Sequence, residues 1–338
     1  MTSSLQIVQD DFVSDRNIQL FLKRDDLLHN YFQEILFGEN KNTPFVSGNK
    51  FRKMKYNLLY MKKMGIRRLL TFGGAFSNHI HATAAAGQML GIETIGVIRG
   101  ERTEPLSPTL RFAEACGMHL RFVNRDDYRN KDLLMKTLKA QISDFYYLPE
   151  GGTNALAMLG TAEIVGEIEQ QLENVAPNFI CTPCGTGGTI AGIISAANAA
   201  THVLGFSALK GDFLQKDVTE LLEMSKNTVY TEGSLSEIFE EKKVRENSHD
   251  NGNWSINTDF HCGGYARFTP ELIQFINNFK QKKGIALDPV YTGKMMLGIY
   301  KLIETGYFPD NSTIVAVHTG GLQGIEGFNQ RFGQLIFV

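Results

Sequence analysis

The chain has 338 residues, of which 43% are hydrophobic and 21% charged, and its formal net charge is −2. A chain of this length buries more than one compact core, which predicts two domains. The near-neutral charge gives no positive surface for nucleic acid, and no apolar run has the length of a membrane span. The first residues lack the basic and apolar regions of a signal peptide, so we expect a cytoplasmic protein without nucleic-acid or membrane partners.

Short apolar runs alternate with amphipathic stretches along most of the chain, which predicts strands and helices in turn. The predicted strands are 66–72, 94–98, 119–123, 179–182, 203–207 and 313–317. The predicted helices are 54–63, 78–89, 110–116, 132–142, 156–172, 190–200, 218–224, 271–283 and 294–304. Residues 247–257 are polar and are expected to form a loop. Such alternation is typical of an α/β fold with parallel sheets flanked by helices.

The four cysteines are too few and too scattered for a disulfide framework. Cys181 and Cys184 form a C-x-x-C pair, but no second pair or nearby histidine completes a zinc site. We therefore expect reduced thiols and no metal.

A Gly-Asn-Lys turn at residues 48–50 leads directly into a predicted helix. The positive end of the helix dipole disfavours an ammonium group and lowers the pKa of Lys50, which suits an amine that attacks an aldehyde. Lys53 lies one turn further along and could meet a phosphate. Taken alone, this segment is better explained by a solvated lysine in a turn.

Two further segments stand between a strand and a helix, where ligand sites collect in α/β folds. In residues 73–79, backbone N–H groups and Ser77 could hold a carboxylate and Asn78 a ring hydroxyl, although an ordinary helix cap by Ser77 or Asn78 explains this segment better when it is taken alone. Residues 184–189 read Cys-Gly-Thr-Gly-Gly-Thr, which suits a phosphate cradle or a simple tight turn. Neither the dinucleotide fingerprint nor a P-loop is present, which disfavours a nicotinamide-dependent dehydrogenase.

Together these segments resemble the fold type II pyridoxal phosphate enzymes, and within them the family of aminocyclopropane carboxylate deaminase and D-cysteine desulfhydrase. The resemblance covers nearly the whole chain, from Leu22-Lys23-Arg24-Asp25-Asp26 through Pro289-Val290-Tyr291-Thr292-Gly293-Lys294 to His318-Thr319-Gly320-Gly321. It implies a tryptophan synthase beta-like fold with two twisted, parallel-rich sheets. Residues 1–49 and 161–338 would form a large cofactor-binding domain, and residues 50–160 a smaller inserted domain. It also implies a homodimer.

The resemblance assigns roles to particular residues. Lys50 is similar to the Schiff-base lysine, Asn78 to the residue that bonds the phenolic oxygen of the cofactor, and Ser77 to the residue that receives the substrate carboxylate. His79 is placed beside them at the substrate site, and Tyr291 and Tyr265 are similar to active-site tyrosines. The residues similar to a phosphate site are Lys53, Gly185, Thr186, Gly187, Gly188 and Thr189.

The residues that would meet the pyridine nitrogen distinguish the two activities. The deaminase typically carries a glutamate after its tyrosine, whereas this chain has Thr292. Thr319 resembles the hydroxyl residue that meets this nitrogen in desulfhydrase-like members, and it gives a weaker electron sink that still suffices for β-elimination. His81 stands where these members often carry arginine.

The predicted activity is therefore α,β-elimination of a small D-amino acid to pyruvate, ammonia and sulfide. The alternatives are a deaminase that converts 1-aminocyclopropane-1-carboxylate to 2-oxobutyrate and ammonia, and a non-catalytic protein that binds pyridoxal phosphate. A non-catalytic protein would have no use for Ser77 and Tyr291, so their presence favours an enzyme.

Overall fold

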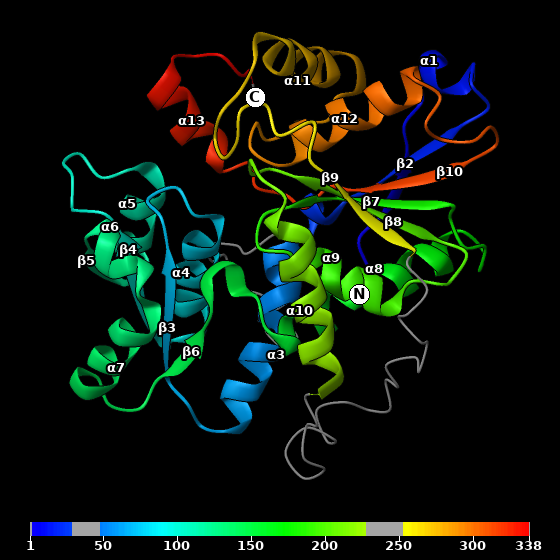
Figure 1. Ribbon diagram of the computed structural model, residues 1–338. Helices are drawn as coiled ribbons and strands as arrows, with labels where there is room; N and C mark the ends of the chain where they lie inside the picture. The colour runs from blue at the N-terminus through cyan, green and yellow to red at the C-terminus, as the bar shows by residue number, and fades with distance from the viewer. Residues whose placement is uncertain (1, 29–47, 228–252, 338) are drawn as a thin grey trace.

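The computed structural model describes residues 2–28, 48–227 and 253–337, which form two separate sheets flanked by helices (Figure 1). Within these residues the larger sheet has six strands, in the order β1-β2-β10-β7-β8-β9. Its strands are β1 (Leu5–Ile7), β2 (Gln19–Lys23), β7 (Phe179–Cys184), β8 (His202–Ser207), β9 (Trp254–Asn257) and β10 (Thr313–Val317). Strand β1 is antiparallel to β2, and the other pairs are parallel.

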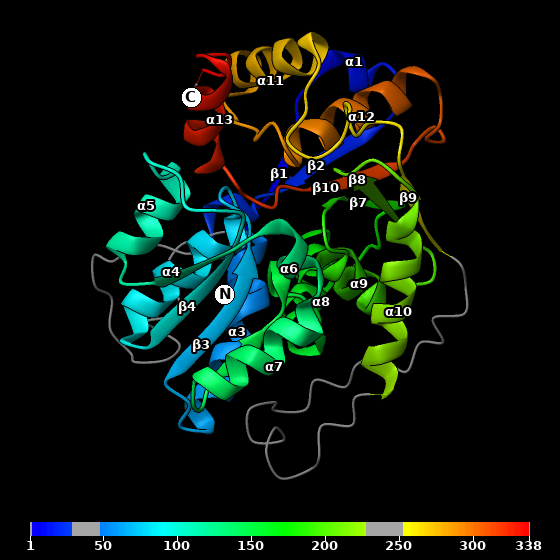
Figure 2. The same cartoon turned by 60° about the vertical axis from the view of Figure 1, so that its left-hand side comes forward.

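The smaller sheet is wholly parallel among the described residues and has the order β5-β4-β3-β6 (Figure 1; Figure 2 labels its strands β3 and β4). Its strands are β3 (Arg68–Gly73), β4 (Glu93–Arg99), β5 (His119–Val123) and β6 (Tyr146–Leu148). Parallel neighbours require crossover connections, and these connections supply the helices that cover the sheet.

Helices pack on both faces of each sheet. The larger sheet has α1 (Asp11–Ser14), α11 (Pro270–Lys283), α12 (Thr292–Glu304) and α13 (Gly324–Phe332) on one face, and α8 (Ala155–Gln171), α9 (Gly188–Ala196) and α10 (Phe213–Asn227) on the other. The smaller sheet has α3 (Asn49–Lys63), α4 (Asn78–Leu90) and α5 (Pro108–Ala115) on one face, and α6 (Arg125–Arg129) and α7 (Lys131–Gln141) on the other. Two 3-10 turns are η1 (Asp25–Leu27) and η2 (Glu150–Gly152).

The side-chain alternation of a strand explains how one apolar run supplies two cores. In β10, Ile314 and Ala316 join the cluster under α11 and α12, whereas Val315 and Val317 join the cluster under α8 and α9. The same alternation in β7 sends the buried thiols of Cys181 and Cys184 into different clusters. Burial raises the pKa of both thiols, to about 12 for Cys184. Both cysteines therefore pack as small apolar side chains.

Several elements differ from the sequence-based prediction. The predicted strands at 119–123 and 313–317 have the observed bounds, but β1, β2, β6, α1, α6 and α13 were not predicted, most of them because they are short or precede the regular alternation. The predicted loop at 247–257 is wrong for residues 254–257, which form the edge strand β9 beside β8, and residues 247–252 lie outside the described residues. The sequence Trp-Ser-Ile-Asn of β9 does alternate apolar and polar side chains, but the run is only four residues long and follows a polar stretch, so the prediction missed it.

The limits of the two predicted domains stay a prediction. Residues 68–148 build the smaller sheet, but the predicted limits at 50 and 160 fall within α3 and α8. These two helices touch closely, since a Cβ at Gly160 would lie 2.0 Å from the carbonyl oxygen of Arg52. Residues 29–47 of the predicted large domain lie outside the described residues.

A buried ion network ties the first turns of α3 to the larger sheet. The guanidinium of Arg52 binds both carboxylate oxygens of Asp25 and both of Glu167, at 2.7–2.8 Å. Lys23 forms a further ion pair with Glu167 at 2.7 Å. Arg52 is 2% exposed and Asp25 is fully buried. The network therefore fixes the helix that carries Lys50.

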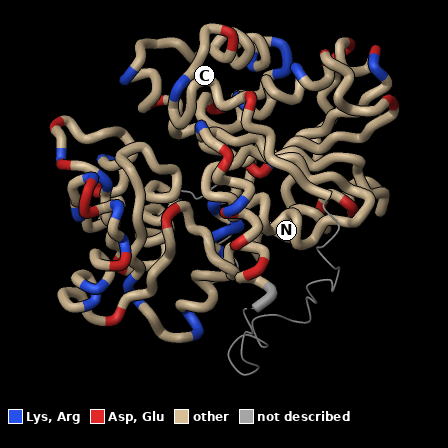
Figure 3. The backbone as a smooth tube through the Cα atoms, in the orientation of Figure 1, with Lys and Arg blue, Asp and Glu red and all other residues tan. Residues whose placement is uncertain are grey.

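Charges of both signs are interspersed over the backbone in Figure 3. Among the helices of the described residues, none has the length and apolar character needed to cross a membrane.

Candidate active site

Loops at the carboxyl ends of strands from both sheets surround a cavity of about 1170 Å³. The strands are parallel, so their carboxyl ends gather on one side of each sheet, where α/β folds place ligands. Every residue that the sequence assigns to a site lines this cavity: Lys50, Lys53, Ser77, Asn78, His79, Gly185, Thr186, Gly187, Gly188, Thr189, Tyr265, Tyr291 and Thr319. The cavity has room for a cofactor together with a small substrate.

Lys50 lies in the first turn of α3, as its sequence context predicts. Gly48 precedes the helix with φ +66°, and a Cβ there would lie 2.1 Å from the carbonyl oxygen of Thr319, so only glycine fits. The backbone N–H of Asn49 donates to the same oxygen at 3.2 Å. The start of α3 is thus docked on the segment that follows β10. Burial lowers the pKa of Lys50 to about 8, the direction also predicted from the helix dipole.

The glycine-rich turn at 185–189 joins β7 to α9 and faces the start of α3. Asn49 Nδ2 donates to Thr189 Oγ1 at 2.9 Å, and the hydroxyls of Thr153 and Thr186 are 2.6 Å apart. Gly187 has φ +76°. These contacts shape an open concavity at a helix N-terminus, which is the geometry of an anion site.

Lys53 places a second amine beside this turn. Its Nζ donates to the carbonyl oxygen of Gly151 at 3.1 Å and to Thr153 Oγ1 at 3.2 Å. A Cβ at Gly188 would lie 3.0 Å from this nitrogen. Burial, and then the charge of Lys50, lower the pKa of Lys53 well below its usual value. A phosphate bound at the turn would counter this effect and keep the amine charged.

The loop after β3 brings a second helix N-terminus to the cavity. Ser77 caps α4, and its hydroxyl accepts from the backbone N–H of Ile80 at 3.3 Å. Asn78 follows, and its Oδ1 accepts from Gln323 Nε2 at 3.1 Å. This contact joins α4 to the loop before α13. The N–H groups of the first turn of α4 can receive a carboxylate.

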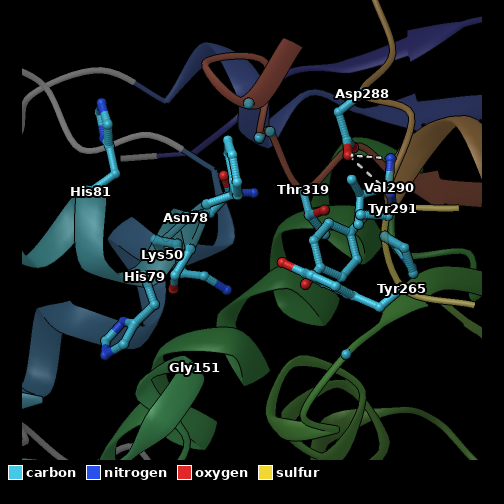
Figure 4. A pocket seen from close by; sticks show the side chains of 18 of the residues that line it. Lys50, Asn78, His79, His81, Gly151, Tyr265, Asp288, Val290, Tyr291 and Thr319 are labelled. Atoms are coloured by element: carbon cyan, nitrogen blue, oxygen red, sulfur yellow. Dashed lines mark hydrogen bonds between the residues drawn. The ribbon is translucent and has the colours of Figure 1, made fainter. Parts of the chain in front are cut away.

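His79 is 1% exposed and lies across the cavity from the two tyrosines (Figure 4). Thr71 donates its only hydroxyl proton to the carbonyl oxygen of Leu148, so it accepts from His79 Nε2 at 2.8 Å. His79 Nδ1 is left as an acceptor without a partner among the described residues. Burial, aided by the charges of Lys50 and Lys53, lowers the pKa of His79 well below its usual value. The ring is therefore neutral, and its predicted contact with substrate stays a prediction.

His81 lies near the opening of the cavity and stacks on Phe112, with ring centroids 3.8 Å apart and planes 7° apart. Burial lowers the pKa of His81 to about 4. A neutral aromatic pair, His81 stacked on Phe112, therefore occupies the position at which the resemblance predicts an arginine.

Asp288 was not singled out from the sequence, although it directly precedes the Pro-Val-Tyr-Thr-Gly-Lys stretch. Its carboxylate accepts from the backbone N–H groups of Val290, Tyr291 and Thr292 at 2.8–2.9 Å and from Thr292 Oγ1 at 2.7 Å (Figure 4 draws the bonds to Val290 and Tyr291). Four donors occupy the four acceptor positions of a carboxylate. Burial outweighs these bonds and raises the pKa of Asp288. The carboxylate thus fixes the backbone of Tyr291.

Tyr291 and Tyr265 meet edge to face, with ring centroids 6.2 Å apart and planes at 67°. Burial raises the pKa of both hydroxyls, and for Tyr291 the nearby Tyr265 adds to the effect. Both side chains therefore stay protonated at neutral pH and can donate hydrogen bonds to a ligand.

Thr292 and Thr319 take different places. The hydroxyl of Thr292 is held between the backbone N–H and the carboxylate of Asp288, and the residue is fully buried behind the cavity wall. Thr319 lines the cavity beside Tyr291 (Figure 4). Of the two threonines, Thr319 is the one placed to meet a ligand.

A family model described as pyridoxal-phosphate dependent enzyme matches residues 21–320. The chain belongs to this family. Pyridoxal phosphate is accordingly its cofactor, and the architecture is that of fold type II enzymes.

Named relatives of this pyridoxal-phosphate dependent enzyme fall into two activities. A provisionally named 1-aminocyclopropane-1-carboxylate deaminase of Pyrococcus horikoshii is 28% identical over 298 residues, covering 86% of this chain and 85% of the relative. The D-cysteine desulfhydrase of Klebsiella pneumoniae is 28% identical over 311 residues, covering 88% and 89%. A solved ACC deaminase homologue has a TM-score of 0.76 at 25% identity and covers 99% of this chain and 94% of its own.

The site of this pyridoxal-phosphate dependent enzyme fits its cofactor. The turn at 185–189 and Lys53 would hold the phosphate, where Gly188 leaves the space that a Cβ would fill against Lys53 and Thr153. Lys50 supplies an amine with a pKa of about 8 on the same helix. The anion site and the amine are the two groups that an aldehyde carrying a phosphate requires.

Proposed function

We propose that this enzyme is a D-cysteine desulfhydrase-like lyase, which converts a small D-amino acid with a β-thiol to pyruvate, ammonia and sulfide. The observation that carries the proposal is the pair of threonines. Thr292 stands where the deaminase typically has a glutamate, and its hydroxyl is hydrogen-bonded to the backbone N–H and the carboxylate of Asp288. The acceptor positions of that carboxylate are themselves filled. Thr319 then offers an uncharged hydroxyl to the pyridine nitrogen. This favours the weaker electron sink that suffices for elimination.

When bound, pyridoxal phosphate stabilises negative charge at the α-carbon of an amino acid joined to it. The first turn of α4, with Ser77, binds and orients the substrate carboxylate. Lys50 Nζ, with a pKa of about 8, is partly neutral near pH 7.5 and takes the α-proton. The hydroxyl of Tyr291 stays protonated and donates a hydrogen bond to the departing sulfur.

The alternative substrate, 1-aminocyclopropane-1-carboxylate, has no proton on its α-carbon, so proton removal by Lys50 cannot start its conversion. The names of the relatives keep this deaminase activity as the second candidate. A cytoplasmic location and assembly as a homodimer complete the proposal, and the homodimer rests on the resemblance alone.

The test is product formation from D-cysteine, L-cysteine, D-serine and 1-aminocyclopropane-1-carboxylate, with pyruvate and 2-oxobutyrate assayed separately. We expect pyruvate from D-cysteine, and loss of at least about 1000-fold in kcat for Lys50→Ala. Lys55→Ala is the matched control, because Lys55 lies on the same helix but pairs with Glu163 outside the cavity. Comparable turnover of D-cysteine and the cyclopropane substrate would contradict the proposal, and 2-oxobutyrate alone would assign the deaminase. Binding of pyridoxal phosphate with no product would favour a non-catalytic protein.

A further inference from the structure

Lys294 is a buried lysine whose ammonium is surrounded by backbone carbonyls. It lies in the first turn of α12 and is 1% exposed. Its Nζ donates to the carbonyl oxygens of Gly264 at 2.7 Å and His261 at 2.8 Å, and it reaches that of Ala208 at 3.5 Å. Among the described residues it forms no ion pair; its hydrogen-bond acceptors are backbone carbonyls, and attraction to Cys262 and Asp288 also favours its charged form. A buried charge is tolerated only where such partners are held in place.

Two of these carbonyls, those of His261 and Gly264, belong to the loop that carries Tyr265. This loop is strained, because Cys262 and Ala266 both have a positive φ of 52°. Cysteine and alanine adopt such angles only where surrounding contacts enforce them. Internal bonds from Gly264 N to the His261 oxygen and from Arg267 N to the Gly264 oxygen use the same two acceptors as Lys294. The ammonium therefore joins the turns on both sides of Tyr265.

We propose that Lys294 is a positioning residue, a built-in cation that holds the strained 261–267 loop and so sets the ring of Tyr265 against Tyr291. Oxygens converging on one point otherwise repel each other, and proteins use the same arrangement of backbone carbonyls to hold K⁺. An ammonium supplied by the chain fills this place permanently. It follows that the enzyme needs no added monovalent cation. Removing the ammonium leaves a group of converging carbonyl oxygens that can bind K⁺ or NH₄⁺.

The role of Tyr265 in catalysis rests on the proposed function, whereas the state of the loop does not. The first measurement is therefore limited trypsin digestion of the holoenzyme at pH 7. Burial lowers the pKa of Lys294 to about 8, so most of it is charged at that pH. Arg267 is exposed within the loop and is the cleavage site to follow by mass spectrometry.

We expect cleavage after Arg267 to be at least about tenfold faster in Lys294→Met than in the native protein, because local opening governs cleavage. Lys301→Met is the matched control, since Lys301 lies on the same helix and is exposed, with partners Glu271 and Glu304. Equal cleavage in the native protein and both variants would overturn the proposal, whatever the substrate proves to be.

The second measurement is turnover of D-cysteine with saturating pyridoxal phosphate. Lys294→Met should lose about tenfold or more in kcat, and KCl or NH₄Cl should recover several-fold of it, whereas tetramethylammonium chloride at equal ionic strength should not. Equal effects of all three salts would contradict a specific cation site. If the methionine variant does not fold, Lys294→Gln, which keeps donors without charge, replaces it. Dependence of the native enzyme on K⁺ would overturn the proposal without any variant.

Discussion

Arg52→Met tests the buried ion network that anchors α3. Methionine matches much of the apolar volume of arginine but removes the four short bonds to Asp25 and Glu167. Asp25 then keeps the hydroxyl of Ser3 at 2.7 Å, and Glu167 keeps Lys23. Two buried carboxylates thus face one remaining cation. Removing one partner of a buried ion pair costs about 3–5 kcal/mol, and here two pairs share the lost partner, so we expect the upper part of that range.

The assay is urea unfolding of the apoprotein, together with thermal unfolding, where about 6 °C or more should be lost. Arg129→Met is the control, because Arg129 is 79% exposed and its partner Asp126 is 89% exposed, so the change should stay within about 0.5 kcal/mol. A loss below about 1 kcal/mol for Arg52→Met would refute the reasoning, since it would mean that the carboxylates are solvated or protonated once the guanidinium is gone.

Three further outcomes follow from contacts in the same region. Gly188→Ala should weaken binding of pyridoxal phosphate about tenfold or more, because its Cβ would lie 2.7 Å from Thr153 Oγ1, whereas Gly166→Ala meets nothing within 4 Å and should not; equal affinities by absorbance titration would contradict the cradle. The rate at which the apoprotein takes up pyridoxal phosphate, divided by that of a free lysine analogue, should be constant below pH 8 and fall above it, because Lys50, with a pKa of about 8, is then already neutral while the analogue still gains neutral amine; a ratio that is constant from pH 6 to 9 would argue for an ordinary lysine. Burial alone would raise the pKa of Glu167, but Arg52 and Lys23 outweigh it and lower the pKa, so its stabilisation is present above its unfolded pKa and is lost as pH falls through the folded one. Glu167→Gln should therefore show a smaller loss of unfolding free energy between pH 6 and 3, and an unchanged slope in urea titrations would speak against this.

The sequence was most informative where pattern and chemistry coincide. Ile314 and Val315 lie in different cores, so both faces of their strand are buried, and the sequence shows this as an uninterrupted apolar run. The glycine-rich composition of residues 185–189 likewise predicts the turn. Short edge elements such as β1 and β9 have too few residues for a periodic signal. Asp288 and Lys294 were missed because their roles depend on backbone groups, which carry no mark in a sequence. Arg52 was passed over for a similar reason, since its two partners lie 27 and 115 residues away.

The cavity draws its walls from segments near both ends of the chain and from both sheets. A cofactor seated there acts as a long-range cross-link, because it binds only the state in which all these segments are assembled. At a thousandfold excess over its dissociation constant, such a ligand adds about 4 kcal/mol to the free energy of unfolding. The supply of the cofactor therefore contributes to the stability of the fold, and stripping the cofactor weakens the architecture as well as the chemistry.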